Sequence, residues 1–147
     1  MRIQRVSIEN FRCFEKFVID LNGEPRLIIG ENAIGKSSLM AAMARALGKE
    51  RTFQRNDFLD LEKAIDIRVT LSDLSGDQLG VFHDAADFTT PPTLTVGAQA
   101  IWDPDTEECE SFHGYPTKGY KKSKPAERDA IDVHWISGSS GNRVGKS

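Results

Sequence analysis

Residues 30–37 read Gly30-Glu31-Asn32-Ala33-Ile34-Gly35-Lys36-Ser37, and the predicted fold is built around this motif. It fits the pattern G-x-x-x-x-G-K-[S/T] without deviation. The mostly apolar run over residues 26–29 precedes it, which is typical of a strand buried on both faces. Helix-forming residues follow from Ser38 to Leu47, and Gly48 supplies a stop. The sequence therefore predicts a strand, a glycine-containing loop and a helix in the order that the pattern requires.

Each residue type in this loop has a physical role. Gly30 and Gly35 allow close backbone turns with inward-pointing N–H groups, and the helix that follows adds its positive N-terminal end. We expect the Lys36 ammonium to lie between the β- and γ-phosphates of a nucleotide and the Ser37 hydroxyl to bind Mg²⁺. Ser38 is placed to add a second hydroxyl contact. The alternative, a glycine-rich turn without a ligand, is disfavoured by the complete match in the correct context.

Alternation of apolar and polar residues predicts further strands. They cover residues 6–9, 17–21, 65–71, 94–102, 109–112 and 131–135. The strands at 65–71 and 94–102 are expected to be antiparallel neighbours. Residues 118–125 are interpreted as a loop, and the spacing of Ser75 and Gln78 is typical of a capping box that begins a helix.

Length and composition exclude several classes of protein. With 147 residues, 39% hydrophobic and 28% charged, the chain has the composition of one ordinary globular domain, which leaves no room for a second large catalytic domain. No apolar run approaches the ~20 residues that span a bilayer, so we expect no membrane segment. The N-terminus lacks an apolar secretory signal, and Cys13 and Cys109 are too few for a disulfide framework. A cytoplasmic location is expected.

Charge is segregated along the chain despite a formal net charge of -3. Residues 1–56 carry 10 basic and 6 acidic groups, residues 57–113 carry 2 and 13, and residues 114–147 carry 7 and 3. Partners respond to local fields more than to the total. The basic first segment, which contains the loop, is therefore compatible with a polyanionic ligand.

The opening strand and the loop together resemble a known family. Ile8-Glu9-Asn10-Phe11-Arg12-Cys13-Phe14, followed by the GxNxxGKS pattern, is similar to the N-terminal lobe of the RecF/SMC/OLD-type ABC ATPases. The resemblance is specific over residues 1–48 and looser to about Leu79, where the pattern is closest to OLD-family ATP-dependent endonucleases. It implies an α/β P-loop NTPase fold, an ABC/SMC-head-like N-lobe with a mixed and antiparallel sheet and one main P-loop helix. It also implies ATP as the nucleotide, with a role in DNA repair or antiphage defence, although no base-reading motif separates ATP from GTP.

The resemblance assigns the site residue by residue. Asn32 matches the polar residue within the family's loop, and Arg12 matches an arginine that lies close to the bound nucleotide; an arginine on a surface turn is the alternative. Gln54 and Asp57 are candidates for the polar loop that approaches Mg²⁺ and the γ-phosphate, although the family's glutamine has no secure match. The implied nucleotide-binding residues are Arg12, Gly30, Glu31, Asn32, Ala33, Ile34, Gly35, Lys36, Ser37 and Ser38, with Ser37 as the Mg²⁺ ligand.

Hydrolysis requires groups beyond this loop, including a Walker B carboxylate that holds the metal. In the resembled families a C-terminal lobe supplies them, with a signature sequence contributed across an ATP-bound dimer. We expect an N-lobe over residues 1–136 and a flexible tail over 137–147, in a truncated or split protein without its own Walker B, signature or nuclease domain. The expected partners are a second copy or a separate C-lobe, and DNA through the complete assembly. No appreciable hydrolysis is expected from the chain alone.

Two other functions remain open from the sequence. A small complete P-loop kinase or nucleotide-processing enzyme would need a carboxylate at the end of a parallel strand, for which Asp103 and Asp132 are the candidates. A non-enzymatic module that docks on a partner is the other. Leu74-Ser75-Gly76-Asp77-Gln78 resembles the signature, and residues 141–147 echo the loop. Both are disfavoured, because no helical region precedes the first and no helix follows the second.

Two side-chain groups have weaker functional interpretations. The first is basic and interleaved with aromatic residues, so that DNA contact competes with a solvated loop as its interpretation. It comprises Tyr115, Lys118, Tyr120, Lys121, Lys122, Lys124 and Arg128. Cys109 and His113 form at most half of a zinc site, since no second pair has suitable spacing.

Overall fold

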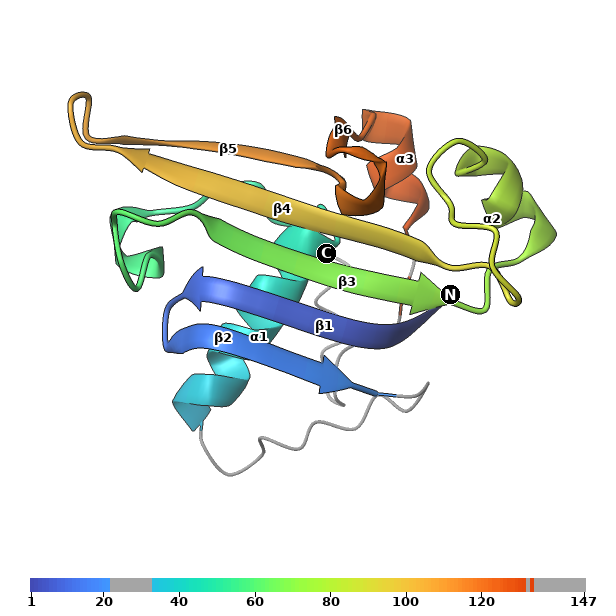
Figure 1. The fold of residues 1–147 in the computed structure, drawn as a ribbon, viewed down its shortest axis with the longest axis horizontal. Helices are drawn as coiled ribbons and strands as arrows, with labels where there is room; N and C mark the ends of the chain where they lie inside the picture. The colour runs from blue at the N-terminus through green and yellow to red at the C-terminus, as the bar shows by residue number, and fades with distance from the viewer. Residues whose placement is uncertain (22–32, 132, 134–147) are drawn as a thin grey trace.

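The computed structural model describes residues 1–21, 33–131 and 133. Its described strands form one six-stranded antiparallel sheet in the order β2-β1-β3-β4-β5-β6, with α1 on one face (Figure 1). The elements, in chain order, are β1 (Arg2–Phe11), β2 (Phe14–Asp20), α1 (Ala33–Ala46), the 3₁₀ turn η1 (Arg55–Asp57), β3 (Ile65–Ser72), α2 (Gly76–Val81), β4 (Leu94–Asp103), β5 (Glu108–Tyr115), the 3₁₀ turn η2 (Pro116–Lys118), β6 (Lys121–Lys122) and α3 (Pro125–Ala130).

The core lies between α1 and one face of the sheet. Every second residue of β3, from Ile65 to Leu71, is fully buried, and the facing residues of β4 from Ala100 to Leu94 are buried opposite them. Such alternation places one complete set of side chains on one face. Buried residues of α1 complete the layer: Leu39, Ala42, Met43 and Ala46. The apolar pattern of the sequence thus fixes which face of the sheet carries the helix.

The C-terminal end of α1 is joined to β5 through His113. Its Nε2 lies 2.7 Å from the Ala46 carbonyl oxygen and its Nδ1 lies 2.7 Å from Ser123 Oγ, while the residue is only 3% exposed. A carbonyl oxygen can only accept, so Nε2 carries the proton that it donates. The chain leaves the helix at Gly48, whose φ of +79° suits glycine.

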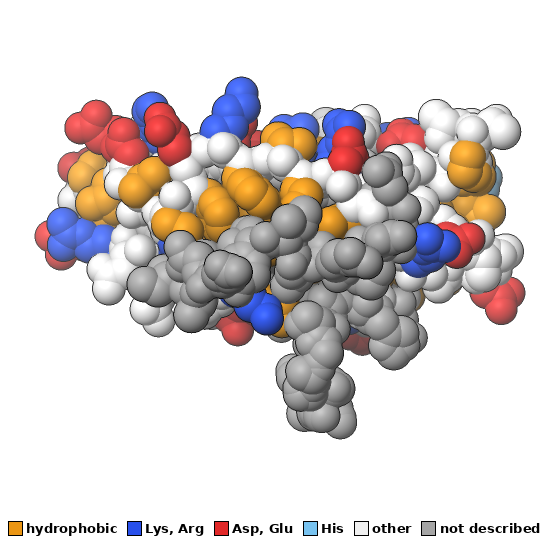
Figure 2. Space-filling model, turned by 90° about the horizontal axis from the view of Figure 1, so that it is seen from below, with side chains coloured by type: hydrophobic (Ala, Val, Ile, Leu, Met, Phe, Trp, Pro, Cys, Tyr) orange, Lys and Arg blue, Asp and Glu red, His pale blue; other side chains and the backbone are white. Residues whose placement is uncertain are grey.

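Gly114 allows β6 to approach β5 closely. It pairs with Lys122, and a Cβ atom at this position would collide with the carbonyl oxygen of Lys121. A glycine here permits a backbone contact that a larger residue would prevent. The opposite edge of the described sheet is β2, whose Val18 is 55% exposed. Figure 2 views the molecule from that side and shows hydrophobic side chains at the surface.

The structure confirms most of the predicted elements. The strands at 6–9, 65–71, 94–102 and 109–112 lie within β1, β3, β4 and β5, and the strand at 17–21 overlaps β2, which ends at Asp20. β3 and β4 are antiparallel neighbours. α1 extends the predicted helix toward its N-terminus, to Ala33. The strand at 26–29 lies outside the described residues, and the parallel pairing expected of a mixed sheet is not seen between the strands that the structure describes.

The last third of the chain departs from the sequence-based prediction in two places. Residues 118–125 contain β6, and α3 begins at Pro125. The strand at 131–135 is not seen at its described residues, since Ile131 caps α3 with its N–H bonded to the Arg128 carbonyl. Ile131 is instead buried as a core residue after the helix. Across the part of the chain that the structure describes, no helix has both the length and the apolar composition needed to cross a membrane.

Candidate functional site

The first residues of α1 carry the described half of the glycine-lysine motif. Gly30, Glu31 and Asn32 lie outside the described residues, and α1 begins at Ala33. Lys36 is half-buried and Ser37 is exposed, so the Ser37 hydroxyl is accessible to a metal ion. The first turn of α1 contains no acidic residue of its own, and the positive end of a helix is suited to an anion.

Ser38 differs from its neighbour in exposure. The residue is only 4% exposed, although it follows directly after the exposed Ser37. Its predicted contact with the ligand stays a prediction.

Arg12 lies in the tight turn between β1 and β2. Its φ of 56° is in the left-handed region, which is uncommon for a residue with a side chain. The Arg12 backbone N–H donates to the Asp57 carbonyl oxygen at 2.8 Å, and Phe11 and Phe58 form an antiparallel bridge beside this bond. The end of β1 is thereby joined to η1, which lies 45 residues further along the chain.

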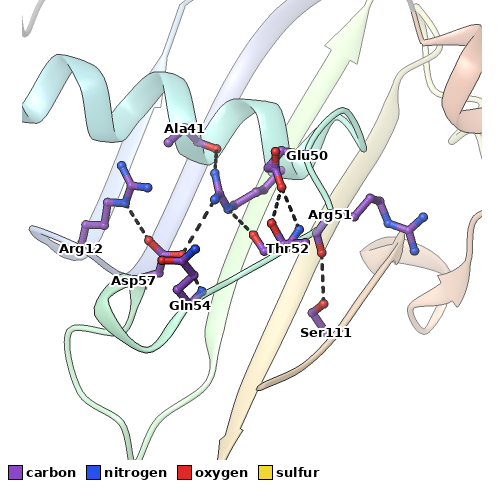
Figure 3. A network of polar contacts seen from close by, with 9 residues as sticks. Arg12, Ala41, Glu50, Arg51, Thr52, Gln54, Asp57 and Ser111 are labelled. Atoms are coloured by element: carbon purple, nitrogen blue, oxygen red, sulfur yellow. Dashed lines mark hydrogen bonds and ion pairs between the residues drawn. The ribbon is translucent and has the colours of Figure 1, made fainter. Parts of the chain in front are cut away.

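Asp57 is a buried carboxylate shared between two arginines (Figure 3). It is 5% exposed; its Oδ1 accepts from Arg12 Nε at 2.9 Å, and its Oδ2 accepts from the Gln54 backbone N–H at 2.8 Å. Arg45 Nη2 of α1 lies 3.8 Å from the same Oδ2. A buried carboxylate requires partners of this kind, because burial without them is costly.

The Arg45 guanidinium makes more contacts within the protein than the Arg12 guanidinium does. Its Nη1 donates to the Ala41 carbonyl and its Nε to the Thr52 carbonyl, each at 3.0 Å. The guanidinium carbon lies 5.5 Å from the centre of the Phe11 ring and 5.3 Å from that of Phe53. Burial lowers the pKa of Arg45, Asp57 opposes that shift, and the charge of Arg12 adds to it.

Among the residues that the structure describes, the Arg12 side chain uses one of its five donors. A guanidinium has five N–H donors, one on Nε and four on the terminal nitrogens. The Nε donor is bonded to Asp57, whereas Figure 3 shows the terminal nitrogens of Arg12 pointing away from that carboxylate. Two guanidiniums share the Asp57 carboxylate, and Glu50 is the other acidic side chain whose charge acts on Arg45. The cluster and the start of α1 both fit a phosphate group.

The network continues from this cluster toward β5. Thr52 donates through its hydroxyl to Glu50, and Ser111 of β5 donates to the Arg51 carbonyl at 3.4 Å.

Gln54, one of the two candidates for the polar loop, is exposed and precedes η1. Asp57, the other candidate for that loop, has its two oxygens against Arg12, Arg45 and the Gln54 backbone N–H.

The carboxylate that a complete kinase-like enzyme would need is not found at Asp103. This residue ends β4, is exposed, and belongs to a strand that pairs antiparallel with both neighbours. Asp132, the second candidate, lies outside the described residues.

Ser75 caps α2, with its hydroxyl accepting from the Gln78 N–H at 3.1 Å, which confirms the capping-box interpretation.

Three members of the two weaker groups are bonded within the protein. Tyr115 is 1% exposed and donates to Glu127 at 2.8 Å, and Tyr120 donates to Asp66 at 3.1 Å. DNA contact by the lysines of this group stays a prediction. Both ring nitrogens of His113 have partners within the protein. Among the residues that the structure describes, no group of three or more His, Cys, Asp or Glu side chains could hold a metal ion.

Sequence reasoning missed Arg45. It lies in the last turn of α1, where the residues from Leu39 to Ala46 are otherwise all Leu, Met or Ala. That contrast was the available signal, because an arginine buried at 10% side-chain exposure needs a carboxylate nearby.

Comparison with known proteins adds one finding. The family model described as "AAA ATPase domain" matches residues 1–130 of the chain. A search with the chain against curated proteins found no match.

Proposed function

Because the chain belongs to the AAA ATPase domain family and is an ATP-binding ATPase lobe of that kind, we propose that residues 30–38 and Arg12 together form its nucleotide site. The observation that carries this proposal is the Arg12–Asp57–Arg45 cluster, in which the four terminal N–H donors of Arg12 have no carboxylate partner among the described residues. The start of α1, with no acidic residue in its first turn, is the second contributor.

The described residues suit the separate parts of Mg-ATP. The Lys36 ammonium supplies a compact positive charge for the phosphates, and the exposed Ser37 hydroxyl is the oxygen ligand for Mg²⁺. The guanidinium of Arg12 supplies paired donors of the geometry that phosphate oxygens accept. Mg²⁺, when bound, neutralises the charge that develops on the β- and γ-phosphates. These roles describe binding and orientation of the nucleotide.

The wider assignment follows the resemblance to RecF/SMC/OLD-type ATPases. We propose that residues 1–136 act as the N-lobe and residues 137–147 as a tail, and that a C-lobe or a second copy supplies the Walker B carboxylate and the signature. Without them the chain binds ATP but does not turn it over appreciably. Its role is then that of an ATP-driven switch in DNA repair or antiphage defence, with DNA bound by the complete assembly.

Isothermal titration of Mg-ATP tests the site directly. We expect measurable binding to the wild-type chain and loss of most of it in Lys36→Ala, because an ammonium bonded to phosphate contributes about 1.5–3 kcal/mol, or roughly tenfold or more in affinity. Lys121→Ala, which removes an exposed lysine of β6, is the matched control and should bind as the wild type does. Equal heats for Lys36→Ala and the wild type would reject the proposal. Steady-state turnover lost in Lys36→Ala would instead reveal an overlooked catalytic carboxylate.

A further inference from the structure

Asp57 is connected to Arg12 twice, which is more than charge neutralisation requires. The Arg12 N–H donates to the Asp57 carbonyl at 2.8 Å, and the Arg12 Nε donates to the Asp57 carboxylate at 2.9 Å. The backbone bond stabilises the left-handed φ of 56° at Arg12, and the side-chain bond sets the direction of the guanidinium. A strained backbone of this kind persists where surrounding contacts fix it.

Within the described residues, the contact through Nε leaves the terminal nitrogens of Arg12 without a hydrogen-bond partner. A carboxylate that accepted from both terminal nitrogens would occupy the same donors that bind phosphate. Here Asp57 accepts from Nε, while the guanidinium carbon lies 5.0 Å from the centre of the Phe11 ring. The Asp57 carboxylate and the Phe11 ring together restrict the Arg12 side chain to one orientation. Fixing such a side chain before binding removes the entropy cost of ordering it later.

The other contacts of Asp57 keep the carboxylate itself in place. Its Oδ2 accepts from the Gln54 N–H at 2.8 Å and lies 3.8 Å from Arg45 Nη2. Arg45 is in turn bonded to backbone carbonyls of α1 and of the following loop. The helix that carries Lys36 and Ser37 and the turn that carries Arg12 are therefore connected through one carboxylate.

We propose that Asp57 is a positioning residue that orients the Arg12 guanidinium toward the phosphates of the nucleotide. This inference rests on the proposed function, since it assumes that ATP binds beside Arg12 and α1. Asp57 itself touches no ligand in this scheme and acts only through Arg12. Its effect on affinity should consequently depend on the presence of Arg12, whereas a general effect on folding would not.

A double-mutant cycle on the full chain tests this dependence, with Mg-ATP as the probe. Asp57→Asn keeps the shape of the side chain but removes its charge, so that two guanidiniums lie close together without a counterion. We expect Asp57→Asn to weaken Mg-ATP binding about tenfold when Arg12 is present and less than about twofold when Arg12 is alanine, as for residues coupled in one network. Equal weakening in both backgrounds, or none in either, would overturn the inference.

The matched control destabilises the same loop without touching Arg12. Asn10 donates to the carbonyls of Asp60 and Lys63 at 2.9 and 2.8 Å, and Asn10→Asp removes both donors while keeping a residue type that tolerates the φ of 61°. We expect lower thermal stability and unchanged Mg-ATP affinity. An affinity loss equal to that of Asp57→Asn would show that loop folding, not orientation of Arg12, is measured.

Failure of the inference is distinguishable from failure of the proposed function. If the wild type binds Mg-ATP and Lys36→Ala does not, the nucleotide site is supported whether or not Asp57→Asn changes the affinity. If the wild type does not bind Mg-ATP, both the nucleotide site and the role of Asp57 are rejected. Should Asp57→Asn not fold, Asp57→Glu keeps the charge but moves it by one methylene group. It should weaken Mg-ATP binding with Arg12 present and leave the Arg12→Ala background unchanged, and equal effects in the two backgrounds would again overturn the inference.

Discussion

Acidification should destabilise this protein through His113 before its ordinary carboxylates are fully protonated. Burial lowers the pKa of His113 to about 4, the bond to the Ala46 carbonyl opposes the shift, and the charges of Arg128, Arg51 and Lys49 add to it. The neutral ring donates from Nε2 to Ala46 and accepts at Nδ1 from the Ser123 hydroxyl. Protonation of Nδ1 would place a second donor against Ser123 Oγ, which already accepts from Arg128 Nη1.

The sign and size of the effect follow from proton linkage. The unfolded chain binds a proton at His113 near pH 6.5 and the folded chain only near pH 4, so the unfolded state takes up more protons between these values. The contribution to stability is therefore complete above pH 6.5 and is lost as pH falls through this window. Between pH 7 and pH 5 the loss amounts to about 2 kcal/mol, and below pH 4 it approaches about 3 kcal/mol.

Urea unfolding at pH 7, 6 and 5 measures this loss when wild type and His113→Gln are compared. Glutamine keeps an amide that can donate to Ala46 and accept from Ser123, but it does not titrate. Carboxylates elsewhere affect both proteins equally, so the difference between the two pH profiles isolates the histidine. We expect the wild type to lose about 2 kcal/mol more than the variant over this range. Parallel profiles would refute the assignment of a buried, neutral His113.

Two further substitutions test local packing. Gly114→Ala should destabilise the fold by about 2 kcal/mol or more, because the new methyl group meets the rigid carbonyl of Lys121; thermal denaturation should show a lower midpoint, whereas Gly80→Ala, which has open space around it, should not destabilise. Ser75→Ala should cost about 1 kcal/mol, because the Gln78 N–H loses its capping acceptor. An unchanged unfolding midpoint for Ser75→Ala would show that the cap contributes nothing to stability.

The sheet was predictable from sequence because its signal is local. Residues 65 to 71 alternate without interruption, and the structure buries every second one. α3 was predictable in principle as well. Pro125 at its first turn and Glu127 two residues later are a helix-start signal, and the alternation of Ile131 and Val133 concealed it. Apolar residues that follow a helix into the core produce the same spacing as a strand.

The candidate site was only half predictable. Lys36 and Ser37 belong to a motif whose geometry is encoded within eight consecutive residues. The pairing of Arg12 with Asp57 joins residues 45 positions apart, and no periodicity relates them. It depends on the bridge between Phe11 and Phe58, which exists only once the sheet has formed. A resemblance could suggest a role for Arg12, but the carboxylate that orients it appears only in three dimensions.

The order of the strands has a consequence for how the molecule assembles. β1 and β2 form one hairpin, and β3 to β6 form a meander between sequence neighbours. Among the described strands, the pairing of β1 with β3 alone joins strands that are not consecutive, and it closes a long segment of chain that includes α1. Closing a long segment is slow, so we expect this junction to form last. Arg12 and Asp57 meet where the junction ends, and their contact would therefore complete only when the two halves of the sheet have joined.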